Sequence, residues 1–276
     1  MNKNLKLIAL VATVFAVQAQ AQTEAPAAAA APESTLTSNV NLVSDYRFRG
    51  ISQTWHLPAV QGGIDYSHVS GFYLGTWASN VSGNSYNNGA GLELDLYGGY
   101  KFSVAQDLTL DFGALAYVYP GARLNSAPGL ATDKKYDNLD LYAALTMGAF
   151  NAKLSIVATD YFGLNSSTAS YAYFNSLAAD GGSKGSTYLD LNYRFDLGGG
   201  VNLDTHLGHL AVRHYGDLSY TDVKLGVSKE FSGFTVGAAL VATDAKKAFY
   251  QAANAAGNDA KRIGGATVVL SVGRSF

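Results

Sequence analysis

The sequence predicts an all-β fold, a transmembrane antiparallel β-barrel of twelve strands, on three observations. First, apolar and polar residues alternate with a period of two along most of the chain, which is typical of strands with one apolar face. Second, the alternating runs are longer than the usual soluble strand of about 5–6 residues, and most of them reach the length needed to cross a bilayer at a tilt. Third, short and long connections alternate between the runs, as in barrels with turns at one end and loops at the other.

The N-terminal residues 1–21 are typical of a secretory signal peptide. Lys3 and Lys6 precede an apolar run at 7–17, and Ala-Gln-Ala follows at 19–21, which is a small-residue cleavage pattern. A buried N-terminal helix is the alternative interpretation. Residues 22–34 are rich in alanine and proline and predict a flexible lead-in. The barrel is therefore expected over 35–276, after export through the periplasm.

Composition excludes several classes of protein. The chain of 276 residues is 48% hydrophobic and only 14% charged, with a net charge of −2 and no cysteine. A disulfide framework and cysteine-ligated metals are excluded, and a nucleic-acid partner is not expected without a basic face. We also expect no cofactor and no metal: segment 133–140 matches no calcium loop, and the glycines at 198–200 lack the strand–helix context of a phosphate loop.

Twelve alternating runs follow one another along the barrel segment. Because their number is even, both chain ends are expected on the periplasmic side of the outer membrane. A soluble β-sandwich or a secreted lectin would also alternate, but with shorter strands and charged outer faces. The runs are 36–49, 60–67, 72–81, 92–102, 108–119, 139–147, 150–156, 189–195, 201–207, 222–228, 234–243 and 268–276.

Aromatic residues gather near the short connections, where a membrane interface favours them. The chain ends on Phe276, and we expect this residue to be recognised by the barrel-assembly machinery. Arg274 departs from the apolar ending common in outer-membrane proteins, and its stem is expected to extend to the interface. The other aromatic residues of this group are Tyr66, Phe72, Tyr100, Phe102, Phe150, Tyr193, Phe195, Phe231 and Phe234.

Part of the chain resembles a known family. The stretches SNVNLVSDYRFRGISQT at 38–54 and PAVQGGIDYSHVSGFYLGTWASNVS at 58–82 resemble a proteobacterial family of porins called TorF-like. ELDLYGGYKF at 93–102 and LDFGALAYVYPG at 110–121 resemble its next two blocks. After residue 121 the resemblance thins to the strand pattern and the final phenylalanine. The resemblance implies the barrel architecture and a porin, without naming a solute.

The polar faces of the runs are expected to point into the barrel, because Arg or Lys facing lipid costs about 2–4 kcal/mol at the midplane. Nine acidic and six basic side chains would then face the lumen. This favours an outer-membrane channel for passive diffusion of small hydrophilic solutes with a mild cation preference, with Arg47, Arg49, Glu93 and Asp95 at its constriction. The pore-lining residues expected in its outer half are Asp45, Arg47, Arg49, Glu93, Asp95, Asp140, Asp190, Asp222 and Lys224.

Three alternatives to an open channel remain at this point. The charges of a small barrel can pair with one another and fill it. A closed barrel can bind a partner or a surface ligand through its loops. The third is an outer-membrane hydrolase using His209 and Ser219, which are expected to face each other at the external rim but lack an obvious residue to orient the histidine. We do not expect an enzyme, and the oligomeric state stays open.

Overall fold

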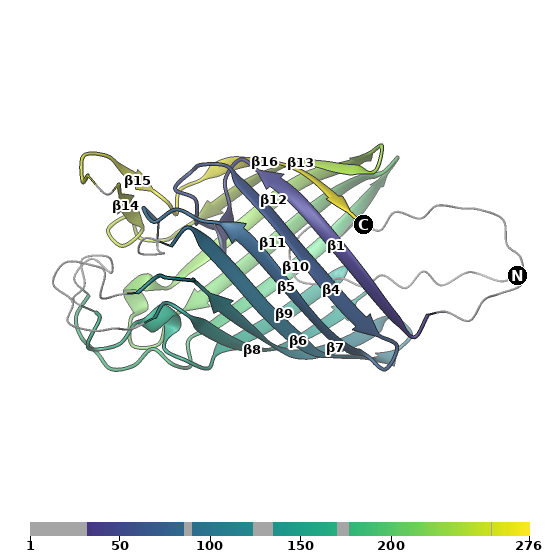
Figure 1. Cartoon of the computed structure of the whole chain (residues 1–276), viewed down its shortest axis with the longest axis horizontal. Helices are drawn as coiled ribbons and strands as arrows, with labels where there is room; N and C mark the ends of the chain where they lie inside the picture. The colour runs from purple at the N-terminus through teal and green to yellow at the C-terminus, as the bar shows by residue number, and fades with distance from the viewer. Residues whose placement is uncertain (1–31, 86–89, 124–134, 170–176, 255) are drawn as a thin grey trace, which may run out of the picture.

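Twelve antiparallel strands close into a barrel (Figure 1), which confirms the predicted fold class. The computed structural model describes residues 32–85, 90–123, 135–169, 177–254 and 256–276, so the predicted signal peptide and most of the lead-in lie outside it. Among these residues, no helix has the length and apolar character needed to cross a membrane. The strands are β1 (Ser34–Val43), β4 (Ala59–His68), β5 (Phe72–Asn80), β6 (Leu92–Ala105), β7 (Leu108–Val118), β8 (Asn138–Met147), β9 (Phe150–Val157), β10 (Thr187–Gly198), β11 (Val201–Ala211), β12 (Tyr220–Phe231), β13 (Phe234–Thr243) and β16 (Thr267–Ser275).

The two ends of the barrel differ. Strands are joined by short turns at the end where the described chain begins and ends, here called the turn end, and by long connections at the opposite loop end (Figure 1). The loop end also carries two small hairpins, β2 (Arg47–Phe48) with β3 (Ile51–Ser52) and β14 (Gln251–Ala253) with β15 (Ala260–Arg262). The predicted alternation of short and long connections is thus confirmed.

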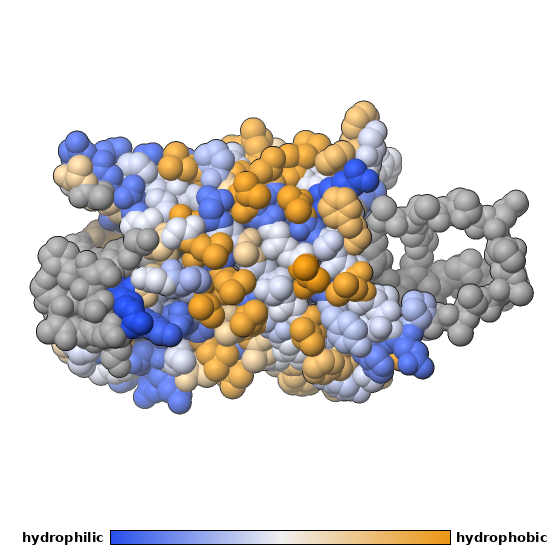
Figure 2. All heavy atoms as spheres, viewed as in Figure 1, coloured by the Kyte–Doolittle hydropathy of each residue, from blue (hydrophilic) through white to orange (hydrophobic). Residues whose placement is uncertain are grey.

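The outer wall is apolar because alternate residues of each strand point outward. Val60, Ile64 and Leu240 are 58%, 50% and 52% exposed, although these side chains would be buried in a soluble protein. Hydrophobic side chains gather over the middle of the face seen in Figure 2, and hydrophilic ones at the loop end. Closure of the sheet pairs the strand edges around the barrel, as a lipid environment requires.

Aromatic rings contact one another outside the turn end of the barrel. The rings of Tyr193 and Phe195 lie 4.4 Å apart, and those of Tyr100 and Phe102 lie 5.9 Å apart. The Arg274 guanidinium lies 5.2 Å from the ring centroids of both Phe234 and Phe276. These cation–π contacts account for a charged residue on the outward face so close to the chain end.

The first strand is shorter than predicted. The alternation runs from 36 to 49, but β1 ends at Val43, and the prediction that this wall strand continues over 44–49 is wrong. Ser44 ends the ladder, since its N–H donates to the Leu270 carbonyl (2.9 Å) and its Oγ accepts from the Leu270 N–H (2.9 Å). Residues 44–58, here called the inward segment, then leave the wall and contact side chains inside the barrel.

Candidate functional site: the barrel interior

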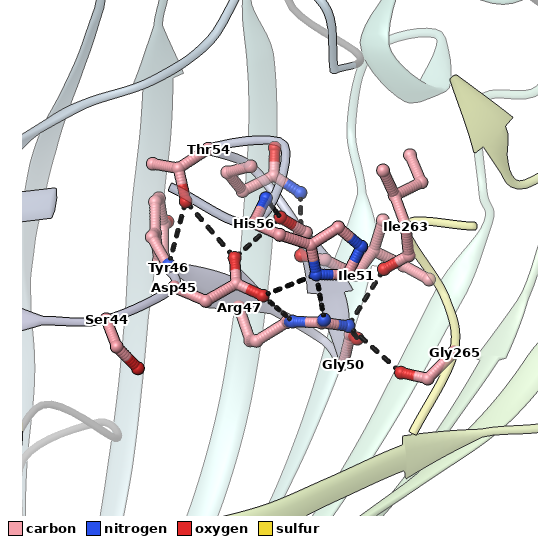
Figure 3. A network of polar contacts seen from close by, with 12 residues as sticks. Ser44, Asp45, Tyr46, Arg47, Gly50, Ile51, Thr54, His56, Ile263 and Gly265 are labelled. Atoms are coloured by element: carbon pink, nitrogen blue, oxygen red, sulfur yellow. Dashed lines mark hydrogen bonds and ion pairs between the residues drawn. The ribbon is translucent and has the colours of Figure 1, made fainter. Parts of the chain in front are cut away.

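The inward segment is organised around one carboxylate. Asp45 accepts hydrogen bonds from Arg47 Nε (2.7 Å), Ser52 Oγ (2.6 Å) and Thr54 Oγ1 (3.1 Å); the bonds from Arg47 and Thr54 can be followed in Figure 3. Thr54 Oγ1 also accepts from the Tyr46 N–H at 3.0 Å. These bonds hold the β2–β3 hairpin in a compact turn, and Asp45 is only 5% exposed.

A second set of contacts fixes the inward segment to the connection between β13 and β16. Arg47 Nη1 donates to the carbonyl oxygens of Ile263 (2.8 Å) and Gly265 (3.2 Å), and both bonds are visible in Figure 3. Trp55 Nε1 donates to the Ala252 carbonyl at 2.9 Å, and Lys261 Nζ lies 3.8 Å from the Trp55 ring centroid. The segment is therefore anchored by the loop end of the barrel.

Arg49 reaches across the interior. Its Nη2 lies 2.6 Å from Asp140 Oδ2 on β8, and its guanidinium lies 4.3 Å from the ring centroid of Tyr188 on β10. The two paired side chains are 5% and 1% exposed. Burial by itself would lower the pKa of Arg49, but the adjacent Asp140 carboxylate raises it well above its ordinary value. The arginine therefore stays charged and joins the inward segment to two distant strands.

Gly50 brings the tip of the inward segment against two further strands. A Cβ at this position would lie 2.4 Å from Thr243 Cγ2 and 2.8 Å from Asp222 Cβ, and the backbone has φ of +78°. Both the space and the left-handed conformation thus require glycine. Together with Arg49, this contact shows that the segment crosses the lumen rather than lying along one wall.

The interior at the loop end, here called the loop half, is packed. Tyr46 and Phe48 of the inward segment place their rings 5.4 Å from Trp77 and 5.3 Å from Tyr117. A cavity of about 50 Å³ remains among the aromatic residues, which is room for only a few water molecules. The buried core also contains Ile51, Tyr119, Tyr136, Leu164, Tyr188, Leu210, Tyr220, Tyr250 and Ile263.

The interior at the turn end, here called the turn half, is lined by charged pairs that solvent reaches. Lys101 and Asp111 approach to 3.8 Å with side chains 22% and 18% exposed. Arg194 Nε lies 2.6 Å from Asp204 Oδ1, and these side chains are 32% and 13% exposed. Tyr73 donates to Asp111 at 2.6 Å. The turn half is thus a water-accessible vestibule whose walls carry both signs of charge.

His206 of β11 lies between the two halves and was not among the predicted site residues. Its Nδ1 lies 3.0 Å from Asp190 Oδ1 and its Nε2 lies 2.7 Å from Asp222 Oδ2. Tyr188 also donates to Asp222, at 2.9 Å. The period-two pattern places His206 on the polar face of its strand, but nothing in the sequence pairs it with acids on the two neighbouring strands.

The structure divides the predicted pore-lining residues into groups. Asp45 pairs with Arg47, and Arg49 pairs with Asp140, so these four hold the inward segment in place. Asp190 and Asp222 meet through His206. Three others stand on the inward faces of their strands, namely Glu93 and Asp95 of β6 and Lys224 of β12.

His209 and Ser219 do not form a hydrogen-bonded pair in the described structure. His209 Nδ1 lies 3.0 Å from Thr221 Oγ1, whereas Ser219 Oγ accepts from the Val212 N–H at 2.9 Å. A nucleophilic serine needs a base within hydrogen-bonding reach, and this geometry does not supply one.

Solved structures of outer-membrane proteins resemble the barrel at low sequence identity. A KdgM porin shares 7% identity over 88% of this chain and 99% of its own, with a TM-score of 0.47. A NanC porin shares 9% over 87% and 98%, with a TM-score of 0.48. An outer membrane channel from Pseudomonas putida F1 shares 14% over 90% and 97%, with a TM-score of 0.44.

Family membership comes from the sequence. No curated protein matches the chain. A family model described as "Bacterial protein of unknown function (Gcw_chp)" matches residues 27–276. The chain therefore belongs to the Gcw_chp family, and the TorF-like name of the resemblance stays a prediction.

Proposed function

We propose that this member of the Gcw_chp family is an outer-membrane channel through which small hydrophilic solutes diffuse, with the inward segment as its constriction. The observation that carries the proposal is the inversion of polarity across the wall. Val60 and Leu240 are more than half exposed outside, whereas charged pairs such as Arg194–Asp204 face a wet vestibule inside. An apolar exterior suits lipid, and a charged, hydrated interior suits polar solutes.

The charges of the interior favour cations. Arg47 and Arg49 are each occupied by a carboxylate of the loop half. Glu93 and Asp95 of β6 also lie in the loop half, and neither forms an ion pair with a basic side chain among the described residues. An excess of carboxylates along a narrow lumen attracts cations and repels anions. A mild cation preference is thus part of the proposal.

A closed barrel is the second candidate, and the packing of the loop half favours it. A cavity of about 50 Å³ does not admit a solute larger than a few water molecules. In this case the inward segment must move before anything passes. The same barrel would then act as a gated channel, or as a surface protein that binds through its loops.

The proposal includes an orientation. The turn end, where the described chain starts and ends, faces the periplasm, and the long connections face outward. The predicted signal peptide at 1–21 supplies the export route, and Phe276 contacts the barrel-assembly machinery. Protease added to intact cells should cleave the long connections and leave an epitope fused to Phe276 intact.

Conductance of the refolded protein in a planar lipid bilayer tests the function. Discrete conductance steps and a reversal potential that favours K⁺ over Cl⁻ in a salt gradient are the expected results. A folded barrel that gives no steps contradicts the open channel. A preference for Cl⁻ contradicts the inference of an acidic lumen. The heat-dependent gel shift of the same sample is the control for folding.

A further inference from the structure

Two buried carboxylates of β6 differ from the other acids of the loop half. Glu93 and Asp95 are two residues apart on one strand, so both point inward, and they are 0% and 8% exposed. Glu93 Oε2 and Asp95 Oδ1 have no hydrogen-bond partner within the described part of the chain. By contrast, Asp45 and Asp140 each pair with an arginine.

The surroundings of the pair offer oxygen ligands and aromatic rings. Tyr46 of the inward segment donates its hydroxyl to Glu93 Oε1 at 2.9 Å, and the Tyr119 hydroxyl also lies beside Glu93. The strand register places Trp77 opposite Asp95. The rings of Tyr46 and Trp77 lie 5.4 Å apart, edge to face. The hydroxyls of Tyr46 and Tyr119 therefore lie against the carboxylates.

An unpaired buried carboxylate is costly, and two neighbouring ones repel each other. A bound cation relieves both costs at once. Carboxylate and hydroxyl oxygens are hard ligands, which suit alkali and alkaline-earth ions rather than transition metals. The described residues contain no group of three His, Cys, Asp or Glu side chains that could hold a metal ion. The site offers two carboxylates and the hydroxyls of Tyr46 and Tyr119, a ligand set that suits a weakly held hard ion rather than a permanently bound metal.

We propose that Glu93 and Asp95 form a binding site for a hard cation in the loop half of the barrel. The assignment of this site as the cation-selecting point of the lumen rests on the proposed channel function. The chemistry of the site rests only on the buried carboxylates and their neighbours. The two proposals can thus fail separately.

Terbium luminescence tests the site directly, because Tb³⁺ binds oxygen ligands as Ca²⁺ does and is sensitised by nearby tryptophan. Addition of Tb³⁺ to the refolded full chain should give saturable luminescence that Ca²⁺ or K⁺ displaces; the order of displacement identifies the class of ion. Glu93→Gln or Asp95→Asn should weaken the apparent affinity on the order of tenfold or more. Trp77→Phe should lower the signal while Ca²⁺ displacement continues.

Asp217→Asn is the matched control, because Asp217 pairs with Lys246 on the exposed loop end at 2.5 Å, with both side chains more than half exposed. This variant should titrate as the unchanged protein does. Absence of saturable luminescence, or luminescence that neither Glu93→Gln nor Asp95→Asn weakens, overturns the site and leaves a protonated pair as the explanation. Conductance without terbium binding overturns only the site, and terbium binding without conductance overturns only the channel.

Discussion

The two halves of the barrel interior contain similar ion pairs, but these pairs have different roles. In the loop half, Arg49 and Asp140 are almost completely buried and lock the inward segment across the lumen. In the turn half, Arg194 and Asp204 make an equally short ion pair, yet the arginine is 32% exposed. An ion pair on the inner wall thus either holds a covering segment in place or stays in contact with water, depending on whether a segment covers it.

Removal of the inward segment should have the largest effect on the difference between the two halves. Residues 45–57 can be replaced by a short Gly-Ser link, since β1 and β4 are antiparallel neighbours that already pair at Val43 and Ala59. The loop half would lose the side chains that cross it, and single-channel conductance should rise severalfold. Conductance equal to that of the unchanged protein would show that the segment does not limit passage.

Arg49→Met tests the buried pair. It leaves the Asp140 carboxylate buried without a counter-charge, which costs about 3–5 kcal/mol. Urea unfolding in lipid vesicles measures this cost. The double variant Arg49→Met, Asp140→Asn removes both charges and should recover most of the lost stability. If Arg49→Met alone is as stable as the unchanged protein, this ion pair does not hold the inward segment in place.

Gly113→Ala tests the wall of the vestibule, where tyrosines lie flat over glycines of the neighbouring strand. A Cβ at Gly113 would lie 2.5 Å from Tyr142 Oη and 2.7 Å from the Gly98 carbonyl. We expect a destabilisation of about 1–3 kcal/mol in the same unfolding experiment. Gly91→Ala is the control, since nothing lies within 4 Å of its added Cβ, and it should be close to neutral.

Arg194→Met should have the smallest effect on stability. The Arg194–Asp204 pair is reached by water, so the substitution should cost less than about 1 kcal/mol, although it removes the same type of charge as Arg49→Met. Its effect should instead be on ion selectivity, since it removes a positive charge beside Asp204 and the vestibule and should raise the preference for cations. A loss of stability as large as that of Arg49→Met would abolish the distinction between the two halves.

The sequence predicts the wall well because one rule governs it. Each strand has an apolar outward face and a polar inward face, so the period of two identifies the twelve strands and places Glu93, Asp140 and Asp222 inside. The even number of strands also accounts for the first and last strands starting and ending at the same end of the barrel. Here local pattern and global fold agree, and the prediction needs no long-range information.

The same rule fails at residues 44–49 for a physical reason. Tyr46 and Phe48 alternate with Asp45, Arg47 and Arg49 as they would in a membrane strand, but their rings pack into the loop half. An alternating pattern reports that one face is apolar, not whether lipid or an aromatic core covers it. The bond from Arg49 to Asp140 spans 91 residues, and no local signal in the sequence specifies such a pair.

The junction between the first and last strands has a consequence for assembly. β1 pairs with β4 over ten residues but with β16 over only five, from Asn39 opposite Ser275 to Val43 opposite Ser271. Strands that are neighbours in a hairpin can pair early. This junction instead joins the first and last strands of the chain, so its pairing has the largest entropic cost of loop closure. It should therefore form last and open first. Since the inward segment begins at Ser44, where that junction ends, closure of the barrel and placement of the inward segment in the lumen become a single event.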